Sequence, residues 1–167
     1  MKPWVRGLDI ATNVAVLIAS CLFAVIAWRI VSHPQNVPSV KPSQQIVGTR
    51  VNLPSVTWQS GKSTVVLALS TECHFCSESK PFYRQLISKA TADGVKVVAV
   101  LPQSPDASKK YLDIDSVAVA QVVQQPLSNL NVSGTPTLLL VDSQGIVTKT
   151  WIGKLDSAAE KEVLAHI

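Results

Sequence analysis

The sequence has little cysteine and little charge, and each shortage excludes a class of protein. Three cysteines among 167 residues are too few for a small scaffold held together by disulfides. Charged residues make up 16% of the chain, and the 15 basic residues exceed the 11 acidic residues by only four. So small an excess provides no basic face for binding nucleic acid. Apolar residues, at 47%, are too frequent for an intrinsically disordered chain.

One long apolar run stands out against this background, at residues 10–28. It carries no charge, and three small polar residues are its only interruptions, whereas core helices of small domains usually have a polar face. As a helix, the run would measure about 28 Å, close to the bilayer hydrocarbon thickness of about 30 Å. We therefore predict a transmembrane anchor at residues 9–31, preceded by a cytoplasmic N-terminus at residues 1–8.

Basic residues at the N-terminus orient this anchor. Lys2 and Arg6 precede the apolar run, and only Arg29 follows it closely, which favours an N-terminus inside the cytoplasm. The expected protein is a single-pass protein of the cytoplasmic (inner) membrane with its remaining residues outside the cytoplasm. Two other fates of the segment stay open: cleavage after Ala27, and lipidation at Cys21, which ends a stretch resembling a bacterial lipobox.

Residues 32–45 are predicted to form a linker, because Pro34, Pro38 and Pro42 recur there without apolar periodicity. Extended at about 3.1 Å per residue, the linker could hold a domain up to roughly 40 Å from the membrane. The remaining residues, 46–167, have the length of one domain.

Strand-like and helix-like segments alternate in residues 46–167. Short apolar and β-branched runs predict strands at 64–70, 95–101, 117–123, 137–141 and 146–151. Helices are predicted at 76–90 and 107–112, with a helical turn at 127–130 and a final helix starting at the capping-box pattern Ser157-Ala158-Ala159-Glu160. The order is β-α-β first and β-β-α last, which indicates an α/β fold with a mixed sheet.

The motif Cys73-His74-Phe75-Cys76 lies where a predicted strand gives way to a helix. The start of a helix favours a thiolate, and a cysteine there can fall from a pKa of roughly 8.5 to about 3.5–7.5. Cys73 is therefore expected to attack, and Cys76 to resolve the mixed disulfide. A zinc site would need four ligands, and no second cysteine pair exists. We predict no metal and no cofactor.

Four features together resemble the thioredoxin-like family, specifically its membrane-anchored thiol-disulfide oxidoreductases of the bacterial extracytoplasmic space. They are the Cys-x-x-Cys motif between strand and helix, Pro81 five residues later, Gly134-Thr135-Pro136-Thr137 before a strand, and a closing hairpin with Gly153 ahead of the last helix. The resemblance covers about residues 48–167. It implies a thioredoxin-like mixed sheet flanked by helices, behind the N-terminal transmembrane helix.

The resemblance also implies roles and partners. Pro136 should be a cis-proline facing the cysteines, and Thr135 and Pro136 should bind the substrate. The partners should be protein thiol or disulfide clients and a membrane protein that regenerates the redox state. The same residues serve oxidation and reduction, so the direction of exchange stays open.

The sequence departs from the family pattern at two positions. Glu72 precedes the first cysteine, where the family often has an aromatic residue, and we expect its carboxylate to face solvent. Leu67 stands where many thioredoxins bury an acid, so the usual proton acceptor for the resolving thiol is missing.

Two residues between the cysteines are candidates for tuning. His74 has two interpretations. As an imidazolium, it would stabilise the Cys73 thiolate and make the disulfide more oxidising. Alternatively, it is an exposed surface histidine without a role in the reaction. Phe75 is expected to be an exposed apolar contact for a partner.

Two other functions compete with thiol-disulfide exchange. Ser70-x-x-Cys73 faintly resembles the active-site loop of a peroxiredoxin, although the upstream proline of that loop is missing. A non-enzymatic copper chaperone would use cysteines three residues apart and a distal histidine, and neither is present.

Overall fold

The computed structural model describes residues 46–114 and 116–167. The predicted cytoplasmic N-terminus (1–8), anchor (9–31) and linker (32–45) lie outside this part of the chain. Within it, no helix has the length and apolar character needed to cross a membrane.

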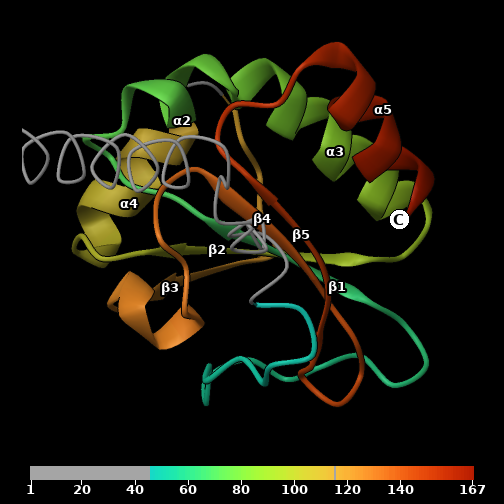
Figure 1. Cartoon of the computed structure of the whole chain (residues 1–167). Helices are drawn as coiled ribbons and strands as arrows, with labels where there is room; N and C mark the ends of the chain where they lie inside the picture. Colours follow the sequence, from blue (N-terminus) through green and yellow to red (C-terminus); the bar gives the residue numbers. More distant parts are fainter. Residues whose placement is uncertain (1–45, 115) are drawn as a thin grey trace, which may run out of the picture. The chain divides into compact units, whose positions relative to one another are not determined.

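A five-stranded mixed sheet forms the centre of the domain (Figure 1). Its strands are β1 (Thr64–Ala68), β2 (Lys96–Leu101), β3 (Gln121–Gln124), β4 (Thr137–Val141) and β5 (Val147–Ile152), in the order β3-β2-β1-β4-β5. The pairs β1·β2 and β2·β3 are parallel, whereas β1·β4 and β4·β5 are antiparallel. All five residues of β1 are buried, as expected for an apolar strand in the middle of a sheet. The predicted mixed sheet is confirmed.

The helices cover one face of this sheet (Figure 1). They are α2 (His74–Glu78), α3 (Lys80–Ala92), α4 (Pro105–Asp113) and α5 (Ser157–Ala165). The crossovers β1-α2-α3-β2 and β2-α4-β3 step across the sheet in the same direction. Since such crossovers are right-handed, their helices lie on the same side. Val65 and Leu67 point to this side and pack with Phe82, Leu112 and Val163 from three helices.

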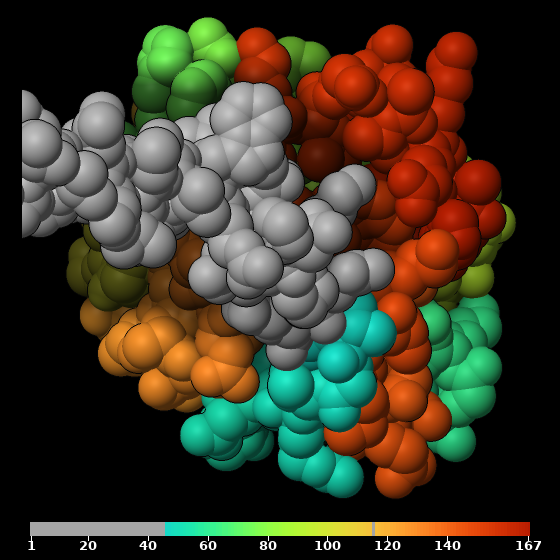
Figure 2. Space-filling view, viewed as in Figure 1, coloured from blue at the N-terminus to red at the C-terminus, as the bar shows by residue number. Residues whose placement is uncertain are grey.

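The opposite face of the sheet is covered without a long helix in the described residues. A second cluster joins Val66 and Val98 of the sheet to Leu130 of the short 3-10 helix η2 (Leu127–Leu130). Residues 46–58, which we call the N-terminal segment, complete this cluster with four buried aliphatic side chains: Ile46, Val51, Leu53 and Val56. The segment and the region of η2 are neighbours on the surface in Figure 2.

The predicted helix 76–90 is wrong in its start and its continuity. Helix α2 begins at His74, and Ser79 separates it from α3. Pro81 lies in the first turn of α3, and because proline has no N–H to donate backward, a break is favoured just before it.

The predicted strand 117–123 is also partly wrong, because β3 begins only at Gln121. The N–H of Val117 donates to the Leu112 carbonyl (3.0 Å) and so belongs to the turn that ends α4. The last helix does begin at Ser157, but its N-cap is Asp156, whose carboxylate accepts hydrogen bonds from Ala158 and Ala159 (3.0 and 2.8 Å). The capping-box assignment was therefore one residue out of register.

Candidate functional site

The two cysteines of the motif lie at the junction between β1 and α2. Cys73 is the N-cap of α2, and its Sγ accepts a hydrogen bond from the Cys76 N–H (3.2 Å). Cys73 is partly exposed, whereas Cys76, one turn along the helix, is completely buried. The two thiols are free rather than joined in a disulfide.

The surroundings of the two thiols shift their pKa values in opposite directions. Partial burial acts to raise the pKa of Cys73, but hydrogen bonds with Cys76 and Thr135 and with the Phe75 backbone outweigh it and lower this pKa below 9.0. Burial, aided by the neighbouring Cys73 sulfur, raises the pKa of Cys76 to about 12, although a hydrogen bond from the Ser70 backbone opposes the rise. The arrangement leaves Cys73 partly exposed with a lowered pKa, and Cys76 buried behind it with a raised pKa.

The loop before β4 lies directly against Cys73, although it is about 60 residues away in the sequence. The Cys73 thiol donates to the Thr135 carbonyl at 3.3 Å, and the Thr135–Pro136 peptide bond is cis. Two further bonds hold the loop: Thr137 Oγ1 donates to the Gly134 carbonyl (2.7 Å), and the Gly153 N–H donates to the Pro136 carbonyl (2.7 Å). The structure thus brings together the two motifs that the sequence resemblance had connected.

The residues between the cysteines point outward. Phe75 is 55% exposed, as expected for a contact with a partner, and Glu72 also faces solvent, as predicted. The imidazole of His74 pairs with the Glu78 carboxylate, at 3.0 Å from Nε2 to Oε1. Glu78 in turn accepts from Lys154 Nζ (2.8 Å), and this hydrogen bond lowers the pKa of Glu78. His74 therefore belongs to a chain of polar surface contacts that continues through Glu78 to Lys154.

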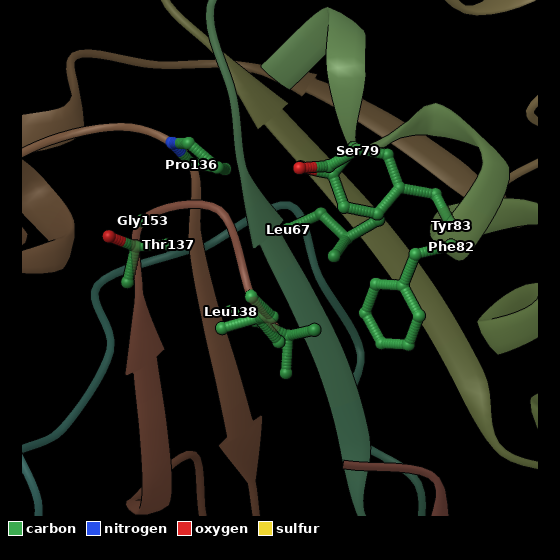
Figure 3. Close-up of a pocket in the computed structure, with 9 residues that line it drawn as sticks. Leu67, Ser79, Phe82, Tyr83, Pro136, Thr137, Leu138 and Gly153 are labelled. Carbon is green, nitrogen blue, oxygen red and sulfur yellow. The ribbon is translucent and has the colours of Figure 1, made fainter. Parts of the chain in front are cut away.

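A small cavity lies behind the site, between α3 and the strands β1 and β4 (Figure 3). Leu67, Tyr83 and Pro136 are among its lining residues, and none of the lining residues is acidic. Burial raises the pKa of the Tyr83 phenol, so this hydroxyl remains neutral. The Ser79 hydroxyl lies close to the phenol but donates to the Phe75 carbonyl (2.8 Å), and the phenol oxygen meets hydrogen-bond geometry with no atom of the described chain. The cavity thus offers the resolving thiol no carboxylate.

Sequence reasoning missed one residue beside the motif, Gln103. Its Nε2 donates to Ser70 Oγ (2.9 Å), and its Oε1 accepts from the Thr71 N–H (3.4 Å). Gln103 follows β2, the parallel neighbour of β1, so both loops leave the same edge of the sheet. That position after an adjacent strand was the available signal in the sequence.

The site shows no sign of a metal centre in residues 46–114 and 116–167. There, no group of three or more His, Cys, Asp or Glu side chains could hold a metal ion.

Comparisons with known proteins show which family and which fold this chain resembles. The model of the AhpC/TSA family matches residues 35–150. No curated protein matches the sequence.

Solved structures with similar folds include DsbE, a thiol:disulfide interchange protein of Chlorobium tepidum, at 27% identity and a TM-score of 0.52, over 64% of this chain and 81% of that one. The thioredoxin domain of a thiol-disulfide oxidoreductase from Bacteroides vulgatus matches at 22% identity and a TM-score of 0.51, over 62% of this chain and 80% of that one. StoA of Bacillus subtilis matches at 19% identity and a TM-score of 0.52, over 63% and 84% of the two chains. The expected thioredoxin-like fold is confirmed.

Proposed function

The chain belongs to the AhpC/TSA family of thioredoxin-like oxidoreductases, and on this premise we propose that it exchanges thiols and disulfides with protein clients outside the cytoplasm. The observation that carries the proposal is the asymmetry of the two thiols. Cys73 is partly exposed and its pKa is lowered, whereas Cys76 is buried and its pKa is raised to about 12. This difference suits an attacking thiol and a resolving thiol.

In the reducing direction, the Cys73 thiolate attacks one sulfur of a client disulfide. The Cys73–client disulfide forms, the client's S–S bond breaks, and the other client sulfur leaves as a thiolate that takes up a proton. Cys76 then loses its proton and attacks Cys73, forming the Cys73–Cys76 disulfide and releasing the second client thiol. The client gains two electrons, and the oxidising direction is the reverse of these steps.

The surface around Cys73 suits a protein client. Thr135 and Pro136 lie beside the sulfur and would pair with an extended client segment through the Thr135 backbone. The exposed Phe75 would add an apolar contact. The similar DsbE is named as a thiol:disulfide interchange protein, which also supports disulfide-bearing proteins as clients.

The proposed location rests on the sequence. The uncharged run at residues 10–28, with Lys2 and Arg6 before it, supports a single-pass anchor in the cytoplasmic membrane with the N-terminus inside. A membrane partner would return the cysteine pair to its working redox state.

Trapping of mixed disulfides tests the proposed function. Cys76→Ser cannot resolve the first intermediate, so it should accumulate covalent, reductant-sensitive complexes with extracytoplasmic proteins. Cys73→Ser is the matched control and should accumulate almost none. Trapping by Cys73→Ser instead would reverse the two roles, and no trapping by either variant would overturn the function.

Peroxide reduction is a second candidate, because the matching family model is that of AhpC/TSA. The Ser70 hydroxyl, which the Ser-x-x-Cys pattern would aim at a peroxide, instead accepts from Gln103 and from the Glu72 N–H (2.9 and 3.3 Å). We therefore expect the purified protein to reduce a disulfide peptide much faster than hydrogen peroxide. Faster consumption of peroxide would favour the second candidate.

A further inference from the structure

Ser70 is the residue whose backbone touches both cysteines. Its carbonyl accepts from the Cys73 N–H at 3.2 Å. Its backbone N–H faces the Cys76 sulfur and acts to lower the pKa of that thiol. Because β1 ends at Ala68, Ser70 lies in the loop between strand and helix rather than in the sheet ladder. The position of Ser70 therefore depends on contacts made by this loop.

The side chain of Gln103 supplies such contacts from the neighbouring loop. Its amide donates to Ser70 Oγ (2.9 Å) and accepts from the Thr71 N–H (3.4 Å), so it holds two consecutive residues of the cysteine loop. Gln103 is itself anchored, because the buried Ser108 hydroxyl donates to its carbonyl at 3.3 Å. The loop is thus tied to the start of α4.

We propose that Gln103 is a positioning residue for the exchange reaction, holding Ser70 where its backbone contacts Cys73 and Cys76. The inference rests on the proposed function and names a residue that controls its second step. Without the amide, the loop would lose two of its hydrogen bonds, and the Ser70 N–H would no longer be held against the Cys76 sulfur. Cys73 would be less affected, because its sulfur is held by the Cys76 N–H and by the Thr135 loop.

The chain offers a matched control at Gln59. Gln59 is also partly buried, and its amide also donates one hydrogen bond and accepts another. It donates to the Gly94 carbonyl (3.3 Å) and accepts from the Lys96 N–H (2.9 Å). Lys96 begins β2, whereas Gln103 follows the end of that strand. Gln59→Met therefore removes an equivalent pair of bonds at the other end of β2, away from the cysteine loop.

The test measures the two steps of the reaction separately, in the purified full chain with a fluorescent peptide that contains one disulfide. In the Cys76→Ser background, Gln103→Met should form the mixed disulfide at an unchanged rate, within about twofold. With Cys76 present, Gln103→Met should release the peptide about three- to tenfold more slowly, as expected when one favourable polar contact with the reacting sulfur weakens. Gln59→Met should leave both rates unchanged.

A double-mutant cycle with Ser70→Ala shows whether Gln103 acts through Ser70. The double variant should release the peptide no more slowly than the slower of the two single variants. If Gln103→Met does not fold, Ser70→Ala tests the inference by itself, because it too should slow the release of the peptide. Equal release rates for Gln103→Met and Gln59→Met, or additive losses in the cycle, would overturn the inference while the proposed function stands. A wild-type protein that forms no mixed disulfide would overturn both.

Discussion

The opposite pKa shifts of the two cysteines predict that an alkylating reagent distinguishes them strongly at neutral pH. A thiol with a pKa of 9.0 is about 1% thiolate at pH 7, so Cys73, whose pKa lies lower, exceeds this fraction. Cys76, with a pKa of about 12, has only about 0.001% thiolate at pH 7. The thiolate fractions therefore differ by at least about 1,000-fold.

Intrinsic nucleophilicity reduces this ratio without removing it. A thiolate of higher pKa is the better nucleophile, and a Brønsted exponent of about 0.4–0.5 over three pKa units favours Cys76 by about 16- to 32-fold. The net expectation is that Cys73 reacts at least about 30-fold faster than Cys76 at pH 7.

The assay is a time course of iodoacetamide alkylation of the reduced protein between pH 6 and 10, with each cysteine followed by peptide mass spectrometry. The Cys73 rate should rise with pH and reach half of its plateau below pH 9, whereas the Cys76 rate should still be rising at pH 10. Cys76→Ser provides the Cys73 rate by itself. The plateau matters because burial alone could make the alkylation of Cys76 slow. Burial of Cys76 could not produce a plateau in the pH dependence of the Cys73 rate, which requires a lowered pKa of Cys73. Similar rates at pH 7, or a Cys73 rate that climbs tenfold per pH unit above pH 9, would refute the reasoning.

Two further predictions concern the ends of helices. If His74 acts as an imidazolium on Cys73, His74→Ala should raise the pKa of Cys73 and make the disulfide more reducing, with about 30 mV for each tenfold change in the equilibrium constant. Equilibration with glutathione measures this potential, and an unchanged value would leave His74 as a surface residue that contacts Glu78. Asp156→Ala removes the cap of α5 and should lower the free energy of unfolding by about 0.5–2 kcal/mol. In urea denaturation, Ser157→Ala should change the free energy of unfolding by no more than about 0.5 kcal/mol. A larger loss for Ser157→Ala than for Asp156→Ala would instead identify Ser157 as the N-cap.

The sequence predicted best those features that are encoded locally. Apolar runs of β-branched residues located β1, β2 and β4 to within two residues, because buried strands need such side chains on both faces. The different exposure of Cys73 and Cys76 also followed from local reasoning, since the start of a helix gives the first cysteine the exposed, hydrogen-bonded position.

Features that depend on contacts across the fold were harder to predict. The apolar composition of residues 117–123 suggested a strand, but the hydrogen bond from Val117 back to Leu112 assigns its start to the end of a helix. Gln103 carries no local pattern, and only the parallel pairing of β1 with β2 brings it to Ser70. The approach of the Pro136 loop to the cysteines was reached through family resemblance, because no periodicity relates residues so far apart, and the hydrogen bond from Cys73 to the Thr135 carbonyl was not predicted.

The N-terminal segment has a practical consequence for anyone who wants a shortened version of this protein. Ile46, Val51, Leu53 and Val56 each bury an aliphatic side chain worth about 1.5–3 kcal/mol, so together they contribute about 6–12 kcal/mol. That is as large as the whole stability of a typical domain, about 5–15 kcal/mol. A recombinant fragment that began at β1 would keep both cysteines but leave Val66, Val98 and Leu139 uncovered, and we expect it to aggregate. Expression boundaries should therefore start at or before Ile46, and proteolytic removal of this segment should likewise yield an aggregation-prone fragment.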